Sequence, residues 1–196
     1  MNKRIFILNG VGTSGKGEFA SRLDKRIPLI KYSIIDLIKE TAENLGWNGG
    51  KTEKDRKFLS DLMDLATEYN DSPYKDVAGL VDAFETELPE EILIIDMRDP
   101  KDIERAVKDF GAETILMRNP RVGKIESNHA DANVEQYKYD YIIENNGSLE
   151  QLDSTIDVFI QTVIEKECAL PESTYCIHYT DSGKNTIVFE CNKMLG

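Results

Sequence analysis

A glycine-rich stretch is the feature with the clearest chemical meaning in the sequence: Gly10-Val11-Gly12-Thr13-Ser14-Gly15-Lys16-Gly17. It follows the short apolar run Ile5–Asn9 and precedes apolar residues at helical spacing, so we expect it to connect a buried strand to a helix. Glycines let backbone N–H groups converge on an anion, the helix N-terminus adds partial positive charge, and a lysine here reaches the β- and γ-phosphates of a nucleotide. The stretch therefore predicts a phosphate-binding loop. The alternative is a glycine-rich turn that binds nothing.

The predicted contacts to phosphate come from eight consecutive or nearly consecutive residues, namely Gly10, Gly12, Thr13, Ser14, Gly15, Lys16, Gly17 and Glu18. Gly17 stands where the strict form of the motif has a Ser or Thr that binds magnesium, so we expect magnesium to be held through water. Glu18 is expected to face solvent, because a carboxylate directed into the loop would repel phosphate.

A carboxylate is predicted close to this loop. Asp96 ends the apolar run Ile92–Asp96, the clearest buried strand in the sequence. The carboxyl ends of parallel strands lie where ligands bind in open α/β sheets, so Asp96 is predicted to orient the waters of a bound Mg²⁺ ion. The alternative is an ion pair between Asp96 and Arg98 that closes the strand.

Strands and helices that alternate along the chain must position these residues. The strands are predicted at Ile5–Asn9, Leu29–Ser33, Ile92–Asp96, Thr114–Met117 and Tyr141–Ile143. Helices between strands imply right-handed crossovers and a parallel sheet covered on both faces. Capping residues predict where helices begin: Thr52 with Asp55, Asp99, and Ser148 with Gln151.

Two other segments have distinct patterns. The helix predicted after Thr52 carries apolar residues at helical spacing: Phe58, Leu59, Leu62, Leu65, Ala66 and Tyr69. Residues 174–191 form two alternating runs around a turn, which predicts a β-hairpin at the sheet edge or on a helix.

With these features the chain resembles the P-loop nucleoside monophosphate kinases, among them the adenylate kinases and the phage and bacterial deoxynucleoside monophosphate kinase-like proteins, over about residues 4–165. The Gly-Lys-Gly sequence is familiar from adenylate kinases, although Glu18 replaces their usual Thr. The resemblance implies an α/β, three-layer P-loop NTPase fold with a mostly parallel five-stranded sheet. The kinase domain would be residues 1–168, with a helical acceptor-binding segment at about 33–90, a short lid at about 119–137 and a C-terminal β-hairpin extension at 169–196.

The resemblance also implies which residues bind the acceptor: Ser33, Asp36, Lys39, Trp47, Arg56 and Arg98. Lys39 stands where the adenylate kinases have an arginine that contacts the acceptor phosphate, and lysine lacks the bidentate fork of that group. Trp47 is equally consistent with a core or hinge aromatic, and Arg56 with a solvated charge.

The catalytic residues implied are Lys16, Asp96, Arg118 and Arg121. Arg118 and Arg121 match two arginines that flank the lid in this family and close over the phosphoryl group. Phosphoryl transfer needs such groups, because it depends on positioning and on neutralising charge on the equatorial oxygens.

Composition limits the partners. Thirty-six acidic against 24 basic residues give a net charge of −12, which argues against non-specific binding of nucleic acid or anionic membranes. No apolar run approaches the ~20 residues of a transmembrane helix, and the N-terminal apolar run is too short for a signal peptide. The three cysteines, Cys168, Cys176 and Cys191, show no CxxC spacing, which fits a reducing cytoplasm.

These observations together predict a cytoplasmic enzyme that uses ATP and Mg²⁺ to phosphorylate a nucleoside or deoxynucleoside monophosphate. A second interpretation keeps the fold and changes the acceptor to another phosphorylated metabolite, such as phosphomevalonate or dephospho-coenzyme A. A third is a nucleotide-binding regulator without catalysis, which Gly17-Glu18 and Lys39 favour slightly.

Overall fold

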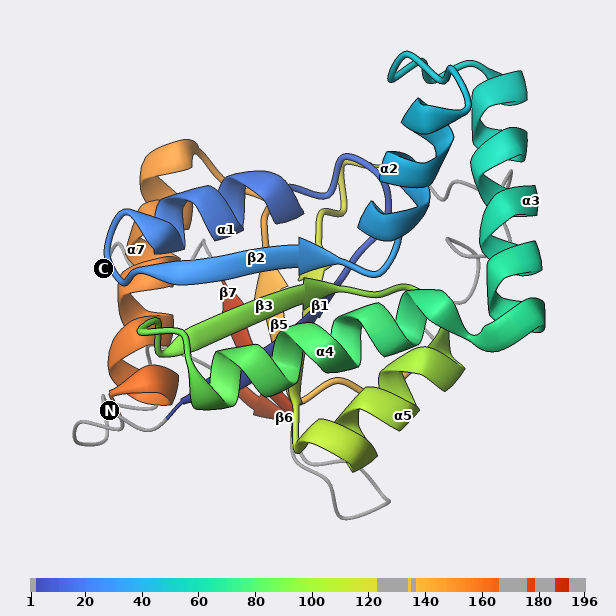
Figure 1. The fold of residues 1–196 in the computed structure, drawn as a ribbon. Helices are drawn as coiled ribbons and strands as arrows, with labels where there is room; N and C mark the ends of the chain where they lie inside the picture. Colours follow the sequence, from blue (N-terminus) through green and yellow to red (C-terminus); the bar gives the residue numbers. More distant parts are fainter. Residues whose placement is uncertain (1–2, 123–133, 135–136, 166–175, 179–185, 191–196) are drawn as a thin grey trace. The chain divides into compact units, whose positions relative to one another are not determined.

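Short apolar runs form the strands of one sheet, and helices follow them in the computed structural model (Figure 1). The structure describes residues 3–122, 134, 137–165, 176–178 and 186–190. Its strands are β1 (Arg4–Asn9), β2 (Leu29–Ser33), β3 (Ile92–Asp96), β4 (Glu113–Arg118), β5 (Tyr141–Glu144), β6 (Cys176–His178) and β7 (Thr186–Glu190). Its helices are α1 (Lys16–Asp24), α2 (Asp36–Asn44), α3 (Glu53–Asn70), α4 (Ser72–Thr86), α5 (Pro100–Phe110), α7 (Leu149–Phe159) and the π-helix η2 (Ile160–Ile164).

The strands lie in the order β2-β3-β1-β4-β5-β7-β6. β1 pairs in parallel with both β3 and β4, and β4 pairs in parallel with β5. The predicted α/β fold with a mostly parallel sheet is thus confirmed. Among the described residues the sheet has seven strands, because the two strands of the predicted C-terminal hairpin join its edge: β7 adds in parallel to β5, and β6 pairs antiparallel to β7. The turn predicted between these two strands lies outside the described residues.

This strand order determines where a ligand would bind. After β1 the chain forms β2 and β3 on one side, and then β4 and β5 on the other. The connection leaving β1 therefore runs toward β2, whereas the connection leaving β4, the strand next to β1, runs the opposite way, toward β5. In open α/β sheets such a switch point is where ligands bind. The glycine-rich loop (Gly10–Gly15) follows β1 at this point.

Helices cover both faces of the sheet. On one face α1 and α7 pack on a continuous apolar core, in which the ring of Phe159 lies 5.8 Å from both Phe6 and Phe19 and 5.6 Å from Phe189. On the other face α5 contacts β1 and β4 (Figure 1). The core therefore fixes the position of α1, which begins directly after the glycine-rich loop.

The helix caps form as the sequence predicts. Thr52 and Asp55 make a reciprocal capping box at α3, and Ser148 and Gln151 make another at α7. The hydroxyl and then the backbone N–H of Thr52 hold the pKa of Asp55 below its usual value. Asp99 accepts a hydrogen bond from the backbone N–H of Lys101 at the start of α5.

Two compact units divide the chain: Tyr32–Pro89, and the remainder. In the Tyr32–Pro89 unit, α3 contacts both α2 and α4, yet none of the described residues of α3 is buried. Leu65 and Tyr69 are 64% and 83% exposed, so part of the apolar face of α3 is open to solvent. The face is wider than the surface that α2 and α4 cover.

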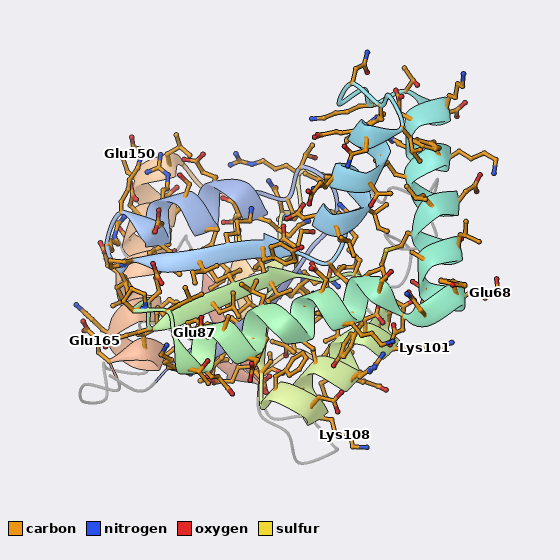
Figure 2. The ribbon with its side chains drawn as sticks, in the orientation of Figure 1. Glu68, Glu87, Lys101, Lys108, Glu150 and Glu165 are labelled. Carbon is orange, nitrogen blue, oxygen red and sulfur yellow. The ribbon has the colours of Figure 1, made fainter. Side chains whose placement is uncertain are left out.

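The surface carries the excess charge. Figure 2 shows long charged side chains projecting from α3, α5 and α7, among them Glu68, Lys101, Lys108 and Glu150. Within the described part of the chain, no helix is long and apolar enough to span a membrane.

Candidate active site

Two positions in the glycine-rich loop have to be glycine, because neighbouring atoms leave no space for a Cβ. A Cβ on Gly10 would lie 2.5 Å from the carbonyl oxygen of Met117. A Cβ on Gly15, which has φ of 105°, would collide with the side-chain amide of Asn145. Between them Thr13 has φ of 64°, a conformation that β-branched residues rarely adopt. The loop is therefore packed tightly between β1, β4 and β5.

Lys16 is directed back over the loop. Its ammonium group donates to the carbonyl oxygens of Gly10 and of Val11, the latter at 3.3 Å. In the described structure no side chain caps α1, unlike α3, α5 and α7, so its first backbone N–H groups are not used by a cap. The loop thus presents an ammonium group and a helix N-terminus together, which is the combination that binds phosphate.

Ser14 and Asn145 join the loop to the end of β5. The side-chain amide of Asn145 donates to the Ser14 carbonyl at 2.9 Å, and its backbone N–H donates to the Arg118 carbonyl at 2.7 Å. The Ser14 hydroxyl is buried and makes no hydrogen bond to any described residue.

Glu18 points away from the loop, as expected. Its carboxylate forms an ion pair with Arg22 one turn further along α1, and the Glu18 side chain is 47% exposed. Because Arg22 also pairs with Asp153 on α7, this carboxylate belongs to a link between α1 and α7. A contact from Glu18 to phosphate could only come from its backbone N–H.

Asp96 lies at the end of β3, next to Leu8 of β1. One of its carboxylate oxygens is 3.7 Å from the ammonium group of Lys31 on β2. A hydrated magnesium ion fits this edge, because Mg²⁺ keeps several waters and takes one or two carboxylates together with phosphates. Asp96 would hold it through water, since Gly17 offers no hydroxyl.

Arg118 is held at the ends of two strands. Its guanidinium donates to Glu144 at 2.9 Å, and the two residues are register partners of β4 and β5. Arg118 remains 39% exposed. Arg121 is exposed in a turn where Asn119 Oδ1 accepts the Arg121 N–H at 3.0 Å. Most of the predicted lid, 119–137, lies outside the described residues.

Three of the predicted acceptor residues come together at the start of α2. Asp36 accepts from the Ser33 N–H at 2.9 Å with one oxygen and from the Lys39 ammonium at 2.6 Å with the other. Nearby, Tyr32 donates to Asp76. Burial first, and then the Asp76 carboxylate, raise the pKa of Tyr32. The ammonium group of Lys39 is thus paired with the Asp36 carboxylate in this structure.

The remaining three predicted acceptor residues lie after α2, in the first turn of α3 and after β3. Trp47 is half-buried after α2, where its backbone N–H donates to the Ala42 carbonyl at 2.9 Å. Arg56 is exposed in the first turn of α3. Arg98 follows β3, and its carbonyl accepts from the Asn9 side chain at 3.4 Å.

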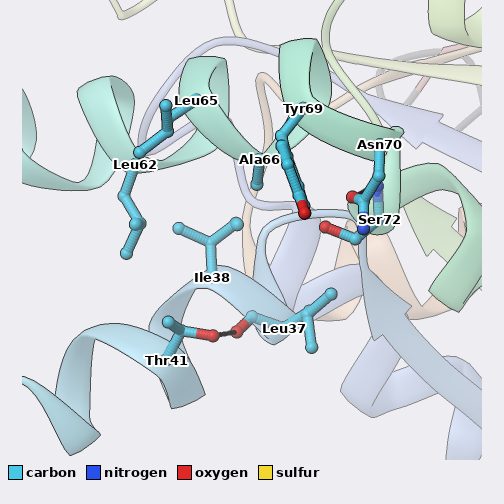
Figure 3. A pocket seen from close by; sticks show the side chains of 9 residues that line it. All are labelled: Leu37, Ile38, Thr41, Leu62, Leu65, Ala66, Tyr69, Asn70 and Ser72. Carbon is cyan, nitrogen blue, oxygen red and sulfur yellow. Dashed lines mark hydrogen bonds between the residues drawn. The ribbon is translucent and has the colours of Figure 1, made fainter.

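An apolar pocket of about 500 Å³ opens within the Tyr32–Pro89 unit (Figure 3). It is formed by α2, α3 and the start of α4, and is lined by Leu37, Ile38, Thr41, Leu62, Leu65, Ala66, Tyr69, Asn70 and Ser72. The exposed residues Leu65 and Tyr69 thus form one of its walls. The sequence pattern of α3 gave no sign of a pocket.

Sequence reasoning also missed Asn9, Lys31 and Asn145. Asn9 is fully buried at the end of β1, where a polar residue in an otherwise apolar strand was a usable signal. Lys31 and Asn145 are recognisable only once the strand order is known.

Solved structures with similar folds include several kinases. The chain is similar to thymidylate kinase from Candida albicans, with 14% identity and a TM-score of 0.50 over 87% of this chain and 96% of that one. It is also similar to shikimate kinase from Bacteroides thetaiotaomicron, with 14% identity and a TM-score of 0.47 over 83% and 98% of the two chains. A third match, a protein from Chloroflexus aurantiacus with 16% identity and a TM-score of 0.37, spans 61% of this chain and 60% of that one.

No protein-family model matches the sequence, and none of the curated proteins does. The similarity to thymidylate kinase therefore shows the α/β fold alone, and any function has to be argued from this chain's own residues.

Proposed function

We propose that the protein transfers the γ-phosphoryl group of ATP to a nucleoside or deoxynucleoside monophosphate. The observation that carries the proposal is the glycine-rich loop at the switch point of the sheet, with Lys16 folded over it and Asp96 and Arg118 at the ends of the two strands that pair with β1. An ammonium group on the phosphates, a carboxylate that orients magnesium and a guanidinium on the transferred group are parts that recur in enzymes of phosphoryl transfer.

In this mechanism Lys16 exchanges the carbonyls of Gly10 and Val11 for the β- and γ-phosphates of ATP. The backbone N–H groups at the start of α1 bind the same phosphates. A magnesium ion, when bound, would neutralise phosphate charge, and Asp96 would orient its waters. No strong base is needed, because the acceptor oxygen is already anionic.

Arg118 and Arg121 would supply charge to the transferring group. Arg118 is held by Glu144 in this structure, so its guanidinium would have to exchange that carboxylate for phosphate. The exposure of Arg118 supports such an exchange, because an ion pair that is 39% exposed on one side contributes little stability.

On the acceptor side, the resemblance implies that Lys39, Arg56 and Arg98 contact the phosphate. The apolar pocket supports an acceptor with an aromatic body such as a nucleobase, whose faces pack on apolar side chains and whose polar edges need a few polar groups. Thr41, Asn70 and Ser72 supply those polar groups here.

A screen of acceptors with MgATP, following ADP release, tests the proposal. The panel contains nucleoside and deoxynucleoside monophosphates, phosphomevalonate, dephospho-coenzyme A and shikimate. We expect turnover with at least one nucleoside monophosphate and none with shikimate, the one compound of the panel that carries no phosphate group. Turnover restricted to a different acceptor would overturn the nucleotide assignment, and MgATP binding without any turnover would favour a non-catalytic protein.

A further inference from the structure

A buried side chain connects the glycine-rich loop to the segment before β5. Asn9 is the last residue of β1 and is 0% exposed. Its Oδ1 accepts the backbone N–H of Gly10 at 2.7 Å, and its Nδ2 donates to the Tyr139 hydroxyl at 2.7 Å. Since the Gly10 N–H can only donate, the orientation of the Asn9 amide is fixed by its partners.

Tyr139 continues the connection away from the loop. Its hydroxyl accepts from Asn9 and donates to the Val134 carbonyl at 2.9 Å. The side chain is 2% exposed and packs in a small apolar cluster with Leu116, against which Val11 of the loop also rests. The Tyr139 hydroxyl is protonated and able to donate at neutral pH, since tyrosine has a usual pKa of ~10 and burial raises the pKa of Tyr139 further.

Gly10 is thus fixed by three groups. Asn9 holds its N–H, the Met117 carbonyl fills the space that a Cβ would need, and its own carbonyl accepts from the Lys16 ammonium. The loop conformation next to Lys16 depends on a hydrogen bond chain that begins at Tyr139.

We propose that Asn9 and Tyr139 are positioning residues that hold the glycine-rich loop in the conformation that binds nucleotide phosphates, an inference that rests on the proposed function. Neither side chain touches the phosphates. Both act through the Gly10 backbone, so that the free loop is already ordered and binding costs less conformational entropy.

A purely structural role predicts a different result. Two buried hydrogen bonds would then contribute only to the stability of the fold. Thr186 provides a matched control, because its hydroxyl donates to the Tyr139 carbonyl at 2.7 Å and is buried, at the opposite end of the same residue from the loop. Thr186→Val removes a buried hydrogen bond to Tyr139 without removing any contact to Gly10.

The experiment compares the dissociation constant for MgATP, measured by titration calorimetry, in the parent and in Tyr139→Phe, Asn9→Ala, the double variant and Thr186→Val. Thermal unfolding of each variant gives its stability. We expect the first two variants to bind about tenfold more weakly, which corresponds to about 1.4 kcal/mol. The double variant should bind about as weakly as either single one, because both changes break the same chain. Thr186→Val should bind like the parent.

Equal dissociation constants in the parent, Tyr139→Phe and Asn9→Ala, with Tm lowered as in Thr186→Val, would overturn the inference and leave the proposed function standing. If Asn9→Ala does not fold, Tyr139→Phe decides, since it removes one hydroxyl only. A parent that does not bind MgATP would overturn the proposed function and this inference with it.

Discussion

Arg118 and Arg121 differ in how they are held, and this bears on how they could act in catalysis. Arg118 is paired with Glu144 across two strand ends, whereas the Arg121 backbone is held in a turn by Asn119. A guanidinium that meets the phosphoryl group only as charge develops contributes to the rate more than to the binding of ATP.

We therefore predict that Arg118→Ala and Arg121→Ala each lower kcat by about 10²–10³, or roughly 3–4 kcal/mol of barrier, with a smaller effect on the Kd for ATP. Steady-state kinetics with the acceptor found in the screen, and calorimetric titration of ATP, measure the two effects. Arg105→Ala is the control, because Arg105 is 45% exposed on α5 and pairs with Asp109 at 3.6 Å. A kcat within about threefold of the parent for both Arg118→Ala and Arg121→Ala would contradict the catalytic role of these two arginines.

A buried tyrosine should make stability depend on alkaline pH. Burial raises the pKa of Tyr139 in the folded protein above the usual ~10. As pH rises, the unfolded chain loses the Tyr139 proton at a lower pH than the folded protein does. The contribution of Tyr139 to the free energy of unfolding is therefore complete below pH ~10 and is lost as pH rises further. Denaturant unfolding between pH 9 and about 11 should show a smaller fall in stability for Tyr139→Phe than for the parent. Tyr69→Phe, at an 83% exposed position, should fall as the parent does; equal falls in all three proteins would contradict the assignment.

At the scale of elements, the strands and caps were predictable because the local signals are strong. The run Ile92–Asp96 is apolar up to its last residue, as a strand buried on both faces must be, and β3 has these same ends. Capping residues fix helix starts through one or two hydrogen bonds between close neighbours, so Thr52 and Ser148 were readable from spacing alone.

The features that could not be predicted depend on contacts between residues far apart in the chain. The ion pair of Arg118 with Glu144 requires the register of β4 and β5, and the contact of Asn145 with Ser14 joins residues 131 apart in the chain. The apolar face of α3 has the spacing of a core helix, and periodicity cannot distinguish a packed face from a pocket wall. The predicted phosphate-loop residues do lie together, whereas the roles given to them remain predictions.

The C-terminal hairpin contributes to the core through β7. Phe189 is 1% exposed, and its ring lies 5.6 Å from Phe159. Phe189→Ala should lower the free energy of unfolding by about 3–5 kcal/mol, because it removes a buried ring and leaves a cavity. Urea unfolding measures the change, and Leu149→Ala, at a 52% exposed position, should change it by no more than about 0.5 kcal/mol. Similar small effects of both substitutions would mean that β7 does not complete the core.

At the scale of the whole molecule, an acidic chain with a net charge of −12 is proposed to bind two anionic substrates. This requires its basic groups to be concentrated where phosphates bind, since the average field of the molecule repels them. We therefore expect substrate binding to depend only weakly on salt concentration. The proposed contacts are short-range hydrogen bonds to Lys16 and the loop backbone, and no diffuse basic surface is involved.

The most direct test of the proposed activity follows the γ-phosphorus of ATP by ³¹P NMR in the presence of Mg²⁺ and the acceptor from the screen. The parent protein should convert the ATP signals to those of ADP while new diphosphate signals of the acceptor grow in equal amount. Lys16→Ala should show no transfer and an unchanged circular dichroism spectrum, whereas Lys25→Ala, an exposed position at the end of α1, should match the parent. Transfer at the parent rate by Lys16→Ala, or release of inorganic phosphate with no phosphorylated acceptor, would contradict the proposal.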